Sequence, residues 1–217
     1  MATDSKVARP VTMLSRIKAA VPLGSTAKLF RSNGLKPIPA LVWDQEFGSG
    51  QWDWLGGLTE MPRNAVIAGY YRSLGASGAI LDVGCGAGVL QPMLDSVGYE
   101  RYLGVDLSKT AIEQAQGRVT PTTRFETANA ESFMPPERFD VIIFNETLFY
   151  MSDPANMLQR YSQYLTPGGK YIISLWLCRE YFRVWRDCKP KLKVLDDTRV
   201  VRNNASWRVR LCTPAER

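Results

Sequence analysis

Three glycines and two aspartates form the pattern with the clearest chemical meaning in this sequence. Gly84, Gly86 and Gly88 follow a short apolar run that contains Asp82. Glycines at this spacing allow a tight turn in which the backbone can approach a ligand closely. A second apolar run ends at Asp106, 22 residues after Gly84. A carboxylate at the tip of such a strand can accept hydrogen bonds from the ribose hydroxyls of a nucleotide-like ligand.

Apolar runs alternate with segments of helical character from residue 79 onward. Continuous apolar strands separated by helices are typical of a parallel sheet that helices cover on both faces, so the expected class is α/β. Two runs at 193–202 and 207–211 flank an Asn-Asn pair and predict a C-terminal β-hairpin. The other predicted strands are 79–83, 101–106, 123–127, 139–144 and 170–176, and the helices are about 87–96, 108–118, 154–165 and 177–192.

The excess positive charge of the chain lies at its N-terminal end. Residues 1–40 contain seven Lys or Arg residues and one acidic residue, so the rest of the 27 basic and 21 acidic residues, 20 of each, lie in 41–217. We expect 1–40 to be a basic arm, either partly disordered or an amphipathic helix that contacts an anionic membrane surface. Because the remaining chain is neutral, a nucleic-acid partner is not expected.

Residues 41–78 precede the first predicted strand and are rich in aromatic side chains. Trp43, Trp52 and Trp54 lie within twelve residues, and a helix is predicted at 61–74. Tryptophan rings can belong to a core, but they also line ligand sites. We expect this segment to form a helical cover over the edge of the sheet that carries the glycines.

The composition excludes several kinds of site. The chain contains no histidine, which excludes imidazole-based zinc sites and Ser-His-Asp or Cys-His nucleophiles. The cysteines at 85, 178, 188 and 212 lack the close spacing of metal ligands, so we expect reduced thiols and no metal. No apolar run approaches the roughly 20 residues that span a bilayer, and no signal core is present at the start. The expected location is cytoplasmic, with peripheral contact at the inner membrane face through the basic arm.

Five separated segments together resemble the class I S-adenosylmethionine-dependent methyltransferases over about residues 79–217. The resemblance implies a Rossmann-like, doubly wound, seven-stranded sheet that is mostly parallel, with an antiparallel C-terminal hairpin. It also implies S-adenosyl-L-methionine as cofactor and S-adenosyl-L-homocysteine as product. A methyltransferase domain would then span 41–217, with 41–78 as cover and 79–217 as core. The five segments are 81–88, 104–108, 128–131, 139–146 and 165–170.

The resemblance implies a role for each polar residue near the ends of these strands. Asp82 would hold the ammonium group of the cofactor, and Asp106 would accept from both ribose hydroxyls. Asn129, where the family often has aspartate, would accept from the adenine amino group. The alternatives are that Asp82 caps a helix and that Asn129 only makes a turn. The predicted cofactor-binding residues are Asp82, Gly84, Cys85, Gly86, Gly88, Asp106, Leu107, Asn129, Ala130, Glu131, Asn145, Trp52 and Arg63.

Two further parts of the cofactor site follow from the same likeness. The helix after Gly88 would point its positive end at anionic groups of the cofactor. Residues 50–63 resemble the entry segment of small-molecule methyltransferases, such as nodulation-type N-methyltransferases and enzymes of polysaccharide and natural-product clusters. That similarity implies that Trp52 or Trp54 packs on the cofactor and that Arg63 faces its carboxylate.

Glu146 and Tyr150 are the predicted catalytic residues. Glu146 could accept a proton, or could orient cofactor or substrate. Tyr150 stands where related enzymes often have histidine, and with an ordinary pKa near ~10 it suits hydrogen bonding better than proton removal. The expected reaction is methyl transfer to a hydroxyl or amine of a small polar acceptor. A sugar, or a polysaccharide or glycolipid precursor, is the preferred candidate.

Three other interpretations stay open at this point. A nicotinamide-dependent oxidoreductase also uses a glycine turn and a distal acid, but its pattern requires glycine where this chain has Val89. An RNA methyltransferase is a second alternative. The third is a protein that binds the cofactor without catalysis and acts through a partner, because no indispensable base is visible.

Overall fold

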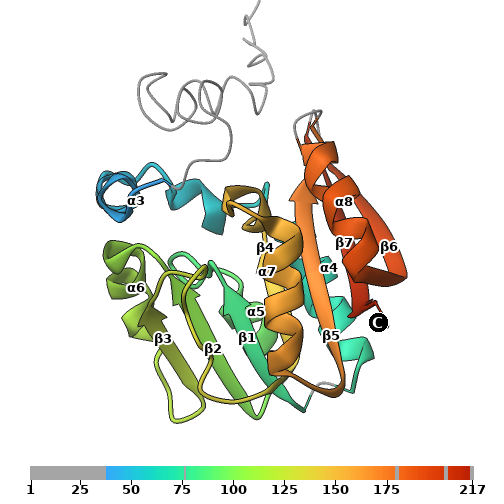
Figure 1. Ribbon diagram of the computed structural model, residues 1–217. Helices are drawn as coiled ribbons and strands as arrows, with labels where there is room; N and C mark the ends of the chain where they lie inside the picture. Colours follow the sequence, from blue (N-terminus) through green and yellow to red (C-terminus); the bar gives the residue numbers. More distant parts are fainter. Residues whose placement is uncertain (1–37, 76, 179–180, 203–204, 216–217) are drawn as a thin grey trace, which may run out of the picture.

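The computed structural model describes residues 38–75, 77–178, 181–202 and 205–215. They form a seven-stranded sheet with the strand order β3-β2-β1-β4-β5-β7-β6 (Figure 1). Strands β1 to β5 are parallel, β7 pairs antiparallel with β5, and β6 pairs antiparallel with β7. This topology confirms the predicted Rossmann-like sheet with an antiparallel C-terminal hairpin. The strands are β1 Ala79–Val83, β2 Arg101–Asp106, β3 Thr123–Thr127, β4 Phe139–Asn145, β5 Leu165–Trp176, β6 Leu192–Arg202 and β7 Ala205–Pro214.

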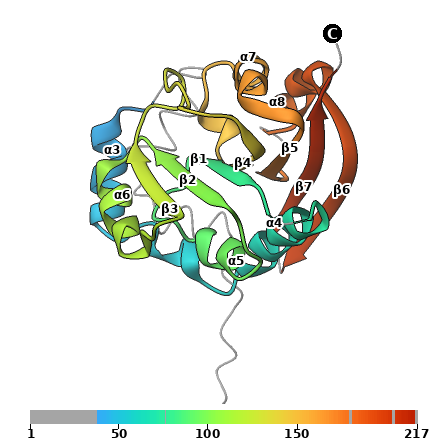
Figure 2. The same ribbon diagram turned by 90° about the horizontal axis from the view of Figure 1, so that it is seen from below.

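Helices cover both faces of the sheet, as expected for a doubly wound fold. In Figure 2, α4 and α5 lie on one side of the strands and α7 and α8 on the other. Local capping sets two of the helix starts: the Ser108 hydroxyl accepts from the backbone N–H of Ala111, and the Asp153 carboxylate accepts from that of Asn156. The helices are α3 Ala40–Gly48, α4 Met61–Ser73, α5 Gln91–Asp95, α6 Lys109–Ala115, α7 Pro154–Tyr161 and α8 Phe182–Cys188.

The hydrophobic core has two parts, one on each face of the sheet. All five residues of β1 are buried, as a central parallel strand requires. On one face, Ile80 packs with Ile67 of α4 and Leu94 of α5. On the other face, Leu81 packs with Leu158 of α7 and Trp185 of α8. The sheet is therefore held rigidly at the point where β1, β2 and β4 end.

Two local predictions differ from the structure. Residues 85–90 form turns, and α5 covers only Gln91–Asp95 instead of 87–96, because Gly86 and Gly88 adopt positive φ, which an α-helix excludes. The helix that follows Gly88 therefore begins at Gln91, and the role of its positive end toward the cofactor stays a prediction. Strand β5 begins at Leu165, earlier than predicted, with an irregularity in its pairing to β4 that absorbs the Pro-Gly-Gly turn.

Some expectations fall outside the described residues. They include the disorder and membrane contact of the basic arm in 1–37, and the Asn-Asn turn at 203–204. Among the described residues, no helix is long and apolar enough to cross a membrane.

Candidate functional site

A tight loop at residues 84–88, the glycine loop, joins β1 to the turns before α5. Gly84, Gly86 and Gly88 have φ angles of 75°, 54° and 72°, a region that favours glycine. A Cβ on Gly84 would lie 2.4 Å from Thr147, and one on Gly88 would lie 2.9 Å from Phe125. Two of the glycines therefore permit packing against the protein itself. A Cβ on Gly86 would lie 3.4 Å from the Phe47 ring, so Gly86 adjoins the cover without a clash.

Replacing Gly84 with alanine is expected to destabilise the fold more than the same change at Gly168. Both positions have positive φ, which costs about 1–2 kcal/mol for alanine. Only Gly84 adds a clash with a neighbouring side chain, and overpacking of this kind costs about 1–3 kcal/mol more. Urea unfolding of the two variants measures the difference, and equal losses would contradict the proposed contact with Thr147.

Asp106 lies at the end of β2 with both carboxylate oxygens fixed by the backbone. Its Oδ2 accepts from the N–H of Gly86, and its Oδ1 accepts from that of Ser108, each at 2.8 Å. Leu107, half-buried, follows directly. Burial raises the pKa of Asp106, while these N–H groups oppose that shift. A carboxylate oxygen can accept more than one hydrogen bond, so the held carboxylate keeps acceptor capacity for a ligand.

Asp82 is fully enclosed at the end of β1. The Tyr102 hydroxyl donates to its Oδ2 at 2.7 Å, whereas Oδ1 is buried and has no hydrogen-bond partner among the described residues. Burial raises the pKa of Asp82 to about 7. Asp82 does not cap a helix, which removes that alternative. Cys85, also buried, packs its sulfur against Gly104, and burial raises the pKa of its thiol.

Arg63 of α4 is buried beside the end of β4. It donates to Glu60 at 2.9 Å and to the Asn145 side-chain oxygen, and its guanidinium lies 3.9 Å from Glu146. Its Nε–H is buried and has no acceptor among the described residues. A buried cation needs compensating partners, so these contacts fix the guanidinium firmly. The geometry brings together Arg63 and Asn145, both predicted as site residues, from segments 82 positions apart.

Glu146 follows β4 in a left-handed conformation with φ of 59°. Its Oε1 accepts from the Ser174 hydroxyl at 2.8 Å, and its Oε2 accepts from the backbone N–H of Trp176 at 3.0 Å. Burial raises its pKa, and the charge of Arg63 opposes that shift. These contacts hold the carboxylate in place, so a role in orienting cofactor or substrate fits Glu146 better than proton removal.

Helix α3 lies over the carboxyl edge of the sheet and is fastened to the start of α6 (Figure 1). The Asp44 carboxylate accepts from the Ser108 hydroxyl at 2.7 Å and from the Thr110 N–H at 3.0 Å. These hydrogen bonds, that of the Thr110 N–H first, lower the pKa of Asp44. The ring next to the glycine loop is Phe47, and Trp52 packs against it at 6.1 Å between centroids. Of the predicted cover, 41–78, helix α3 lies over this edge, whereas α4 packs against one face of the sheet.

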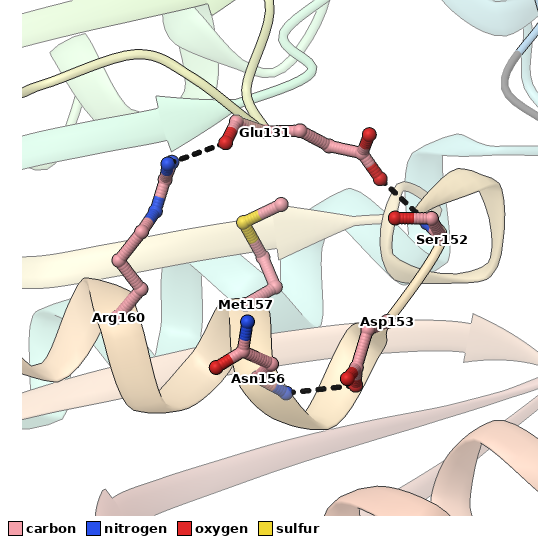
Figure 3. Close-up of a pocket in the computed structure, with 6 residues that line it drawn as sticks. All are labelled: Glu131, Ser152, Asp153, Asn156, Met157 and Arg160. Atoms are coloured by element: carbon pink, nitrogen blue, oxygen red, sulfur yellow. Dashed lines mark hydrogen bonds between the residues drawn. The ribbon is translucent and has the colours of Figure 1, made fainter.

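The loop after β3 carries the residues predicted to lie near adenine. Asn129 accepts from the backbone N–H of Glu131 at 2.9 Å, which makes its turn role evident. Arg160 of α7 donates to the carbonyls of Ala130 and Glu131, and the Glu131 carboxylate accepts from the N–H of Ser152 (Figure 3). The hollow in Figure 3 has a volume of about 80 Å³, well below the roughly 300 Å³ of a typical ligand pocket. The hydrogen bonds of Asn129, Ala130 and Glu131 therefore fix the shape of the loop after β3.

Four residues in this site are absent from the sequence-based prediction. Asp44, Phe47, Tyr102 and Arg160 act on residues far away in the sequence, and no local spacing marks them. Ser108, in contrast, directly follows the predicted strand tip and has the N-cap type that begins a helix. Of these residues, only Ser108 carries a signal that can be read from the sequence.

Comparison with known proteins shows which family the middle of the chain resembles. Residues 81–173 match the model of the family described as "Methyltransferase domain". The ubiquinone biosynthesis O-methyltransferase of Leptothrix cholodnii is 34% identical over 44% of this chain and 43% of its own length. Phosphoethanolamine N-methyltransferase 1 of Triticum aestivum is 35% identical over 46% of this chain and 21% of its own length. The chain thus spans less than half the length of these curated relatives.

A solved structure agrees with this match. The N-methyltransferase NodS of Bradyrhizobium japonicum, in complex with S-adenosyl-L-homocysteine, superposes with a TM-score of 0.67 and 18% identity. The superposition covers 80% of this chain and 99% of NodS, so the two share their fold. Residues 81–173 thus match a methyltransferase domain, and the described part of the chain has the fold of NodS.

Proposed function

We propose that this chain transfers a methyl group from S-adenosyl-L-methionine to a small polar acceptor. The observation that carries the proposal is Asp106, whose two oxygens are fixed by backbone N–H groups at the tip of β2. A carboxylate in this place suits a ribose diol, because each oxygen can still accept from one hydroxyl. The backbone of Gly86 is adjacent, since its N–H makes one of those bonds.

The methionine part of the cofactor matches two buried atoms of opposite type. Asp82 Oδ1 is an acceptor, and Arg63 Nε–H is a donor, and neither has a partner among the described residues. Unsatisfied buried polar atoms are rare and costly in proteins, so a ligand that pairs them gains affinity. We assign the ammonium group to Asp82 and the carboxylate to Arg63, with Gly84, Cys85 and Gly88 shaping the loop between.

The chain contributes orientation to the reaction. When bound, the cofactor supplies a methyl group on a positively charged sulfur, which needs no further activation. Glu146 and Asn145 form a fixed polar wall beside it, since both are held by protein contacts. Alignment of an acceptor with the carbon–sulfur bond can supply on the order of 7–11 kcal/mol of the barrier. Tyr150 is assigned to positioning of the acceptor.

For the acceptor we propose a hydroxyl or amine compound, with a saccharide or a saccharide precursor as the specific candidate. The relatives include both O- and N-methyltransferases, which supports the class without choosing the atom. Half-buried rings such as Trp43 and Trp52 offer flat apolar faces on which a sugar ring can pack. Contact of the basic arm with a membrane surface would give access to a lipid-linked sugar.

Two measurements test the proposed function. Calorimetry on the intact protein is expected to detect binding of S-adenosyl-L-homocysteine with a one-to-one stoichiometry. Incubation with methyl-labelled cofactor and fractionated host extract is expected to place label in a small polar compound. Absence of binding would overturn the proposal, and binding with no transfer to any fraction would favour a non-catalytic partner protein. Label in RNA would point to the RNA methyltransferase alternative.

A further inference from the structure

A continuous series of aromatic rings crosses the carboxyl edge of the sheet. It begins beside Gly86 and joins three segments that are distant in the sequence. Successive ring centroids are 6.1, 5.9, 4.8, 4.2 and 4.0 Å apart. We name these rings the aromatic band; in order they are Phe47, Trp52, Trp43, Tyr150, Phe149 and Tyr181.

The middle of the aromatic band lies at the place where the reaction would occur. Tyr150 belongs to the turn η3 (Leu148–Tyr150) after β4, and Thr147 just before it packs against the glycine loop. Burial raises the pKa of Tyr150, and the carboxylates of Glu146, Glu46 and Asp106 raise it further. The charges of the acid proposed for ribose and of the acid at the end of β4 therefore both act on this hydroxyl. Trp43 meets Tyr150 edge-on at 88°.

Neither predicted catalytic residue is suited to take a proton from an alcohol. The Glu146 carboxylate is held by hydrogen bonds from Ser174 and Trp176 and lies 3.9 Å from the Arg63 guanidinium, whose charge opposes proton uptake. The phenol of Tyr150 stays protonated because burial and nearby carboxylates raise its pKa. The chain has no histidine. An alcohol acceptor must lose a proton as the new bond forms, which is the step that a general base assists. An uncharged amine attacks with its own lone pair and needs no base.

We propose that the aromatic band is the acceptor subsite and that the acceptor atom is an uncharged amine nitrogen. This inference rests on the proposed function and narrows it. The nitrogen lone pair forms the N–C bond while the electrons of the C–S bond pass to sulfur. Positive charge thereby moves from sulfur to nitrogen, and the extra proton on nitrogen leaves to solvent. Aromatic faces attract cations, so the band stabilises the charge that forms there.

Binding of a cation to the intact protein saturated with S-adenosyl-L-homocysteine tests the subsite. Choline and its uncharged isostere 3,3-dimethylbutan-1-ol are titrated against tryptophan fluorescence. Choline is expected to bind about tenfold more tightly, which corresponds to a cation–π contribution in a partly dry site. Trp43→Leu is expected to remove this preference, whereas Trp43→Phe keeps a ring and retains it. Equal affinity for the two compounds, or a preference that survives Trp43→Leu, would overturn the assignment of the subsite.

Methyl transfer tests the acceptor atom. Matched pairs, glucosamine with glucose and 2-phenylethylamine with 2-phenylethanol, are supplied with labelled cofactor. Label is expected only in the amines, at a rate that rises with pH as the ammonium form of the acceptor loses its proton. Label in a hydroxyl compound would refute the amine inference and leave the methyltransferase proposal standing. If S-adenosyl-L-homocysteine itself does not bind, the proposed function fails first.

Discussion

Replacing Asp106 with alanine is expected to weaken the binding of S-adenosyl-L-homocysteine by about 100-fold or more. The proposed contacts are two hydrogen bonds from ribose hydroxyls to a carboxylate, and bonds to charged groups contribute about 1.5–3 kcal/mol each. The loss has a second source, because the N–H groups of Gly86 and Ser108 lose the acceptor that now fixes the loop. Calorimetry with the intact protein measures the affinity.

Glu126→Ala is the matched control for this experiment. Glu126 lies on the neighbouring strand β3, is exposed, and forms no part of the proposed site. Its removal changes the net charge by the same amount and is expected to leave the affinity within about twofold, as for a surface change. Asp106→Asn separates charge from packing, since it retains the shape and loses the negative charge. Unchanged affinity in Asp106→Ala would disprove the assignment of the ribose site.

The central part of the fold could be predicted from the residues because its signals are local. Apolar runs give β1, β2 and β4, and the glycines with the terminal aspartates give the edge where a ligand binds. The predicted start of the helix at about residue 87 was wrong, because Gly86 and Gly88 have positive φ angles and the turns continue to residue 90. Helical periodicity cannot reveal this, since it records the side chains and not the backbone dihedral angles.

The interior of the site depends on tertiary contacts that a single sequence does not contain. Arg63 was expected to face only the cofactor, yet the structure gives it three protein partners, which are Glu60, Asn145 and Glu146. Trp52 or Trp54 was expected to pack on the cofactor; the structure places Phe47 beside the glycine loop and Trp52 against Phe47, and a contact with the cofactor stays a prediction. In both cases the residue type indicated what kind of group the side chain could bind. The contacts that the side chain makes within the protein can be seen only in the folded chain.

The affinity for S-adenosyl-L-homocysteine is expected to rise as pH increases from 5.5 to 7, through the ionisation of Asp82. Burial raises its pKa to about 7, so the carboxyl is mostly protonated below that pH. The ammonium of the ligand pairs best with the ionised form, and binding therefore releases a proton. The expected gain is up to about tenfold per pH unit below 7, levelling off above it. Calorimetry in buffers of different ionisation enthalpy measures the released proton.

Replacing Asp82 with asparagine is expected to have opposite effects on ligand affinity and on stability. This combination distinguishes a ligand contact that titrates from a purely structural contact. A carboxyl whose pKa is higher in the folded chain than in the unfolded chain favours folding at low pH. That contribution is lost as pH rises from about 4 to about 7, and at pH 8 the ionised group costs about 4 kcal/mol. Asparagine still accepts from Tyr102 but cannot ionise. At pH 8 the variant is thus expected to unfold at a higher temperature than the unmodified chain, and at pH 4 the two are expected to differ little. Its affinity for the ligand is expected to fall and to lose most of its pH dependence. A variant that kept the full pH dependence of binding would show that Asp82 does not meet the ammonium group.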